Sequence, residues 1–203
     1  MAVAPDEKPT TIPLNQIWAY EMPGTRNILE LDVASKNQDA RRIVSSITES
    51  SFGRAAKRKF KDLARPGFAV TGTGNTALRA AHAVLVVGAK PRTEFSTNDE
   101  ITLIFFSELV SRCLVQIHKV ERTGDQIEIL YELKPDIGGL NFTNFALIPL
   151  GKLPAGKYEV KMRQLPHELT TAEIKYHYKP LDEKWSRNFL CKPFNFTVAK
   201  KGE

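Results

Sequence analysis

A glycine-rich turn is the part of this sequence whose spacing best fits a chemical site. Gly72-Thr-Gly74-Asn-Thr-Ala77 follows the apolar run Phe68–Thr71 and overlaps a short helix predicted over residues 76–82. Glycines let the backbone approach phosphates, and the N–H groups of a helix N-terminus attract negative charge. A second strand predicted at 83–87 would complete the order strand, turn, helix, strand. The helix is short for such a unit, which needs about 30 residues. A nucleotide-binding enzyme acting through Gly72 and Gly74 is therefore the second alternative function.

The histidines, cysteines and carboxylates do not form a catalytic or metal-binding pattern. No two histidines have the spacing of a zinc-ligand pair. Cys113 lies in an apolar run, where a thiol is usually an unreactive core residue. Glu128 and Glu132 share the outward side of a predicted strand, and nothing near them in sequence predicts raised pKa values. We therefore expect no catalytic residue, no metal and no cofactor. The histidines are His82, His118, His167 and His177.

A basic run lies in the second of two predicted helices. Its cations are Arg54, Lys57, Arg58, Lys59 and Lys61. The net charge of the chain is +6, and one cationic helix face can bind an anionic polymer. A solvated helix face is the simpler interpretation, because the charge of the remaining chain is mixed in sign. Binding of nucleic acid or another anionic polymer through this run is the first alternative function.

A helical periodicity is found in residues 39–63. Apolar residues recur there at multiples of four positions from Val44 to Phe60, which places them near one face. A serine-rich stretch and Gly53 interrupt the pattern, so it predicts two helices, at 39–48 and 51–63. Pro66 ends the second helix, because proline disfavours helical backbone in the residue before it.

The last third of the chain alternates apolar and polar residues. A period of two is typical of strands with one buried face. In Asn195-Phe-Thr197, for example, it predicts Phe196 inside with Asn195 and Thr197 outside. A turn at Thr123-Gly-Asp125 joins two of the strands as a hairpin. An edge strand is predicted within 12–20 and a long surface loop at 170–184. The remaining strands are predicted at 68–71, 83–87, 101–106, 113–120, 126–133, 142–150, 157–163 and 189–198.

Two of these segments resemble parts of a known family. The stretch Ala146-Leu-Ile-Pro-Leu-Gly-Lys-Leu-Pro-Ala-Gly-Lys-Tyr-Glu-Val160 resembles the L-P-A-G-x-Y-x-V phrase of many bacterial exported immunoglobulin-like β-sandwich domains. The ending Phe194-Asn-Phe-Thr-Val198 is similar to their closing strand. The resemblance covers residues 83–199 and implies a sandwich fold and an extracytoplasmic location. It carries over no functional residue, and no tryptophan stands at core spacing between Cys113 and Cys191 as in antibody domains.

The sequence is compatible with two cellular locations. Residues 1–11 are polar and proline-rich and look like the start of a mature exported protein, periplasmic or secreted. A cytosolic protein with a loose N-terminus is the alternative. Cys113 and Cys191 are compatible with one disulfide and equally with two buried thiols.

The sequence as a whole predicts a mainly β protein. Residues 66–203 are expected to form an immunoglobulin-like antiparallel β-sandwich, and residues 1–65 an extended and helical segment packed on it. No apolar run is long enough to cross a membrane. The favoured function is a non-enzymatic, exported binding or scaffold module that recognises a protein or a glycan. Loops on rigid scaffolds carry function, so the candidate binding residues lie on connections. They are Thr123, Asp125, Lys134, Asp136 and Asn144.

Overall fold

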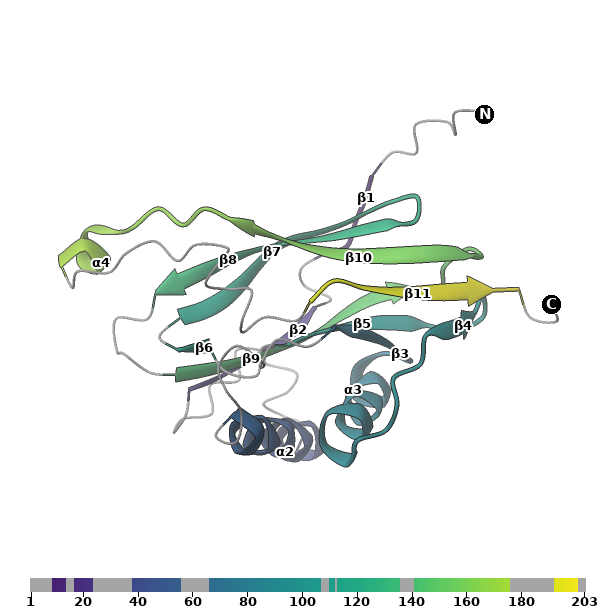
Figure 1. The fold of residues 1–203 in the computed structure, drawn as a ribbon, viewed down its shortest axis with the longest axis horizontal. Coiled ribbons are helices and arrows are strands. Elements are labelled where there is room, and N and C mark those ends of the chain that lie inside the picture. Colours follow the sequence, from purple (N-terminus) through teal and green to yellow (C-terminus); the bar gives the residue numbers. More distant parts are fainter. Residues whose placement is uncertain are drawn as a thin grey trace.

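The computed structural model of the chain contains two β-sheets stacked face to face, with helices covering one of them (Figure 1). The prediction of a mainly β protein is confirmed, and two packed sheets are consistent with a sandwich. None of the described helices combines the length and apolarity that crossing a membrane requires. The structure describes residues 9–13, 17–23, 38–55, 66–106, 110–111, 113–135, 141–175 and 192–200.

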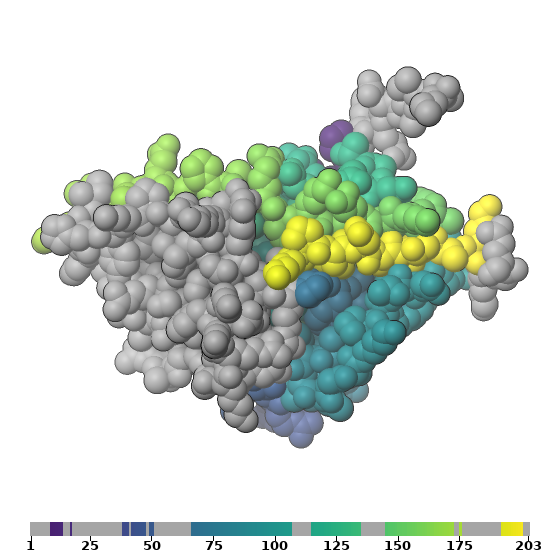
Figure 2. Space-filling view, viewed as in Figure 1, coloured from purple at the N-terminus to yellow at the C-terminus, as the bar shows by residue number. Residues whose placement is uncertain are grey.

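Sheet A is built largely from the second half of the chain. Its strands, in spatial order, are β1 (Thr10–Thr11), β7 (Cys113–Thr123), β8 (Gln126–Pro135), β10 (Gly156–Leu165), β11 (Phe194–Ala199) and β4 (Glu94–Ser96). Strands β7 and β8 form the predicted hairpin, and Gly124 in its turn has a φ of 56°. The short strand β4 was not predicted. In Figure 2, β11 (yellow) runs alongside β10 (green).

Sheet A is mixed, so the expectation of a purely antiparallel sandwich is wrong. Strand β10 pairs with β8 in parallel, and β4 pairs with β11 in parallel. The reason is the path of the chain between β8 and β10. The intervening strand β9 (Asn141–Gly151) lies in sheet B, so the chain crosses to the other sheet and returns in its original direction. A parallel pair requires a crossover of this kind, whereas a hairpin reverses direction.

Sheet B is antiparallel throughout its described pairings. Its strands are β2 (Trp18–Pro23), β9, β5 (Ile101–Phe106) and β3 (Phe68–Thr71), in that order, with β6 (Val110–Ser111) paired to β9. All residues of β5 are buried, which is expected for a strand covered by sheet A on one face and by helices on the other. The edge strand predicted within 12–20 corresponds in part to β2, which begins at Trp18 and stands at one edge of the sheet, while β1 lies before the predicted range.

The core between the sheets is formed by the apolar half of the alternating pattern. Ile127, Tyr158 and Phe196 are 1%, 1% and 3% exposed, so the two-residue period does mark one buried face. The ring of Tyr158 stacks on that of Phe196 within sheet A, with centroids 5.2 Å apart. Contact between the sheets includes the rings of Phe105 and Tyr131, whose centroids are 5.9 Å apart. Aromatic contacts of this kind add to the burial of apolar area.

Helices cover the outer face of sheet B (Figure 1). Helix α2 spans Gln38–Ala55 without a break, so the two helices predicted there are one; residues 56–65 lie outside the described part. Helix α3 spans Gly74–His82 and continues as a π-helical turn, Ala83–Val87. The strand predicted at 83–87 is therefore wrong. The predicted loop at 170–184 contains a short helix, α4 (Thr171–Lys175), and its later residues are not described.

Two polar side-chain contacts join α2 to α3, one exposed and one partly buried. Asp39 accepts a hydrogen bond from Arg79 at 3.2 Å. Ser46 Oγ and His82 Nε2 lie 3.1 Å apart. Beneath these contacts, α3 and its continuation bury Ala77, Leu78, Ala81 and Leu85. Their spacing places them on one helical face, which explains why this segment packs on the sheet although α3 itself is short.

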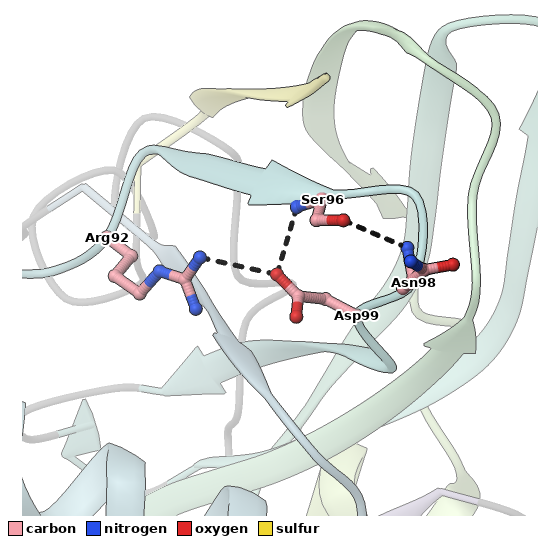
Figure 3. A network of polar contacts seen from close by, with 4 residues as sticks. All are labelled: Arg92, Ser96, Asn98 and Asp99. Carbon is pink, nitrogen blue, oxygen red and sulfur yellow. Dashed lines mark hydrogen bonds and ion pairs between the residues drawn. The ribbon is translucent and has the colours of Figure 1, made fainter. Parts of the chain in front are cut away.

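A polar network closes the turn between β4 in sheet A and β5 in sheet B (Figure 3). Asp99 Oδ2 accepts hydrogen bonds from the Ser96 backbone N–H at 2.9 Å and from Arg92 Nη2 at 3.2 Å. The Asn98 backbone N–H donates to Ser96 Oγ at 3.2 Å. Arg92 also lies over the ring of Phe95, 4.8 Å from its centroid. Side-chain oxygens that bind nearby backbone N–H groups stabilise turns of this type.

Replacing Asp99 with alanine is expected to lower the free energy of unfolding by about 1.5 kcal/mol, because two donors lose a charged acceptor at a partly buried turn. Urea unfolding measures this change. The control is Asn98→Ala, since Asn98 contributes its backbone N–H, which alanine retains; its effect is expected to stay within about 0.5 kcal/mol. Equal effects of the two substitutions would show that the Asp99 carboxylate does not hold the turn.

Candidate functional site

The outer face of sheet A, meaning the side turned away from sheet B, carries the polar half of the alternating pattern. Phe196 points into the core, whereas its neighbours Asn195 and Thr197 point outward. The orientation predicted for this triplet is therefore confirmed. The neighbouring strand repeats the arrangement, with Tyr158 buried between the outward residues Lys157 and Glu159. This face is the place where polar side chains of several strands can act together.

An open groove of about 400 Å³ crosses this face over β8, β10, β11 and β4. Strand register produces its lining, because residues paired across a sheet stand side by side. Glu159 is paired with Gln126 on one side and with Asn195 on the other. Thr197 stands in the next row, between its partners Lys157 and Glu94. The full lining is Thr93, Glu94, Gln126, Lys157, Tyr158, Glu159, Asn195, Phe196 and Thr197.

Glu159 gives the groove a fixed negative charge. Its carboxylate forms an ion pair with Lys161, with Oε2 and Nζ 3.0 Å apart. A hydrogen bond from Lys161, and a smaller contribution from a hydrogen bond with Gln126, hold the pKa of Glu159 below its ordinary value, because they stabilise the ionised form. The groove therefore contains the ionised carboxylate of Glu159, the acidic side chain of Glu94, two amides, two threonine hydroxyl groups and the side chain of Lys157.

A second cluster on the outer face joins Glu132 to two histidines. Glu132 lies on β8, and its side chain is 12% exposed. His118 Nε2 on β7 donates to Glu132 Oε2 at 2.6 Å. His167 Nδ1, from the segment after β10, donates to Glu132 Oε1. The side chain of His167 is 7% exposed and that of His118 is 35% exposed, so one imidazole is enclosed and the other is accessible.

A β-bulge places His118 in this cluster. The register of β7 against β8 shifts between Ile117 and Lys119, so His118 is the additional residue of β7. Bulges of this type redirect a side chain and are common beside functional sites. Without the bulge, His118 and Val120 would share a face; with it, Val120 is buried at 0% exposure while His118 remains outside.

The environment of Glu132 keeps it ionised. Partial burial by itself would raise the pKa of Glu132, but hydrogen bonds from His167 and His118, and the charge of Lys134, bring it below the ordinary 4.5. Perturbed carboxylates of this kind occur both at functional sites and in structural ion-pair networks. The prediction that nothing raises the pKa of Glu132 agrees with this net direction.

The binding residues expected from the sequence are not brought together in one site. Thr123 and Asp125 lie at the β7–β8 turn, and Asp125 approaches Gly156 at the start of β10, close to the groove. Lys134 lies near the opposite end of β8, about 30 Å along the strand, where it acts on Glu132. Asn144 belongs to β9 in sheet B, and its side chain is not described. Asp136 lies outside the described residues.

The remaining candidates fall wholly or partly outside the described chain. Arg54 belongs to the last turn of α2, but its side chain is not described. Cys113 begins β7, and the placement of its thiol is likewise not described. The cations Lys57, Arg58, Lys59 and Lys61 and the second cysteine, Cys191, lie beyond the described ranges. Neither the basic-run hypothesis nor the disulfide is tested by the structure.

The glycine turn does begin a helix, as expected. Gly72 and Gly74 have φ angles of 91° and 50°, and α3 starts at Gly74. Strand β3, which precedes the turn, is paired antiparallel with β5. The segment after α3 is helical where the second strand of a nucleotide-binding unit was expected. The turn therefore stands in a different structural context from the strand–helix–strand unit that its spacing predicts.

Among the residues that the structure describes, no three histidine, cysteine or acidic side chains are arranged to hold a metal ion. Glu132 is surrounded by donors rather than by further acidic ligands, and its two oxygens are each bound by an imidazole. Comparison of the chain with protein-family models, with curated proteins and with solved structures found no significant match, so the site has to be interpreted from its own chemistry.

Proposed function

We propose that the protein is a non-enzymatic binding module that recognises a glycan through the groove on the outer face of sheet A. The observation that supports this proposal is the lining of the groove, where strand register aligns amide, hydroxyl and carboxylate groups in two rows. Gln126 and Asn195 both donate and accept hydrogen bonds, and Glu159 accepts them. A sugar presents hydroxyl groups that do the same, so this lining is complementary to it.

The strand pairing beneath the groove indicates that a ligand there is bound by side chains and not by backbone groups. Strand β10 is paired on both sides, with β8 and β11, and β11 is paired with β10 and β4. The backbone groups of β10 are therefore engaged on both sides, and an extended peptide cannot add a further strand beside β10. Tyr158 and Phe196 turn their rings into the core, so the groove does not offer the aromatic anchors typical of protein interfaces.

The same proposal includes an immunoglobulin-like sandwich fold and an extracytoplasmic location. The segment that resembles exported immunoglobulin-like domains spans the end of β9, the turn and the first half of β10. It carries the chain from sheet B to sheet A, as a connection between the two layers of a sandwich does. The other similar segment, Phe194–Val198, lies in β11, the last described strand.

A glycan array followed by calorimetry with the best-bound oligosaccharide tests the proposal. Asn195→Ala and Gln126→Ala are each expected to weaken binding about tenfold, because each removes one or two neutral hydrogen bonds, worth about 1.4 kcal/mol in total. The matched control is Asn98→Ala, an exposed asparagine at the β4–β5 turn outside the groove, which is expected to bind as the unmodified protein does.

Two results would contradict a glycan-binding groove. One is a protein that binds no oligosaccharide at millimolar concentration. The other is oligosaccharide binding that Asn195→Ala, Gln126→Ala and Asn98→Ala leave equally strong. A peptide that competes for Asn195 and Gln126 would reassign the groove to a protein partner.

A further inference from the structure

We propose that His118, Glu132 and His167 form an acid-released latch, which at neutral pH fastens the segment after β10 to the outer face of sheet A. The proposal concerns a different part of this face from the groove and does not depend on glycan binding. Its geometric basis is the position of Glu132 between two imidazoles that come from separate parts of the chain.

The position of His167 explains what the latch holds. Strand β10 ends at Leu165, and residues 166–170 follow without regular secondary structure before α4. Leu165 is the last residue of β10 paired with β8, and its partner is Glu132. The bond from His167 to Glu132 therefore fastens the chain just beyond the point where the backbone pairing ends. His118 holds the same carboxylate from the opposite side, because the bulge turns it outward.

Protonation of Glu132 weakens the hydrogen bonds that its carboxylate accepts from the two imidazoles. The described groups that act on this carboxylate are His167 from the segment after β10, His118 from β7 and Lys134 from β8. At neutral pH one negative charge accepts hydrogen bonds from both imidazoles. In acid the protonated carboxyl group is neutral, so it no longer offsets the charge of Lys134 and is a weaker hydrogen-bond acceptor for both imidazoles. Weakening of these bonds in a partly buried site then favours release of His167.

The pH range follows from the direction of the shift at Glu132. Its pKa in the folded protein is lower than the ordinary 4.5, so its contribution to holding the segment is fully present above 4.5. The contribution is lost as the pH falls through the lowered folded value. Release is therefore expected below pH 4.5.

Nuclear magnetic resonance tests the latch in the full chain. The readout is the Overhauser contact between the ring of His167 and the side chain of Glu132, followed from pH 7 to pH 3 together with the contact between Phe105 and Tyr131 in the core. We expect the His167 contact to disappear with a midpoint below pH 4.5 while the core contact persists. Glu132→Gln is expected to lose the His167 contact already at pH 7.

Glu128→Gln is the matched control, because Glu128 lies on the same strand and face and pairs with Arg163 at an exposed position. It is expected to keep the wild-type midpoint. The latch is excluded if the His167 contact survives at pH 3 with the core intact, or disappears only together with the core. It is also excluded if the Glu132→Gln protein keeps the contact at pH 7. The titration of the unmodified protein decides the question even where the variant does not fold.

Discussion

Replacing Phe105 with alanine is expected to lower the free energy of unfolding by about 4 kcal/mol, the largest single effect we expect from this fold. Phe105 lies on the central strand β5 of sheet B and is 1% exposed. Its ring contacts Tyr131 of sheet A. Alanine would remove this contact and leave a cavity between the sheets, which both lose apolar burial. Urea unfolding followed by fluorescence or circular dichroism measures the change.

Two further substitutions identify the cause of this loss. Phe105→Leu keeps most of the volume and is expected to cost about 1.5 kcal/mol. Val87→Ala removes apolar atoms from a side chain that is 73% exposed, and is expected to change stability by less than about 0.5 kcal/mol. If Phe105→Ala cost no more than Val87→Ala, the two sheets would not share the core described above.

Strands in the second half of the chain could be predicted because one face of each is apolar and buried while the other is polar. Ile127, Ile129 and Leu133 are each at most 1% exposed, while the glutamates between them point outward. A two-residue period has no other common structural cause, so the strands predicted at 126–133 and 157–163 agree with β8 and β10 to within two residues at each end. Strand β5 was recognised from its continuous apolar run, which suits a strand covered on both faces.

The same reasoning failed at residues 83–87. An apolar run of this length is typical of a buried strand and also of a helix end, and periodicity cannot distinguish the two. Here α3 continues through Ala83–Val87 and ends at Gly88, whose φ of 87° terminates the helix. The order of the strands in the sheets could not be predicted from the sequence either. The parallel pairing of β8 with β10 arises because β9, which lies between them in the chain, belongs to sheet B.

The cluster around Glu132 depends on contacts that are distant in sequence. The β7–β8 hairpin predicts which residues of the two strands lie side by side, and it places Gln116 opposite Glu132. His118 reaches Glu132 only because the bulge adds one residue to β7, and His167 comes from the irregular segment after β10. A regular hairpin register therefore does not indicate His118 beside Glu132, and no local sequence pattern indicates His167. The lining of the groove could not be predicted for the same reason, since each row combines residues from strands that are far apart in the chain.

Replacing Gly72 with alanine is expected to lower the free energy of unfolding by about 3 kcal/mol. The φ of Gly72 is 91°, a left-handed conformation that costs a residue with a side chain about 1–2 kcal/mol. The added Cβ would lie 2.6 Å from Thr76 Cγ2, which adds an overpacking cost of about 1–3 kcal/mol. The backbone cannot move away easily, because the Gly72 N–H donates to the Glu100 carbonyl and the Gly72 carbonyl accepts from Thr102 Oγ1, each at 2.7 Å.

Gly88 provides a matched control for this prediction. Its φ of 87° is nearly the same, but no atom lies within 4 Å of the position that a Cβ would occupy. Gly88→Ala is therefore expected to cost only the conformational part, about 1 kcal/mol. Combining Gly72→Ala with Thr76→Ser removes Cγ2 and should restore part of the lost stability, which urea unfolding of the set would measure. Equal losses for Gly72→Ala and Gly88→Ala, without any recovery from Thr76→Ser, would mean that left-handed backbone alone requires glycine at the start of α3.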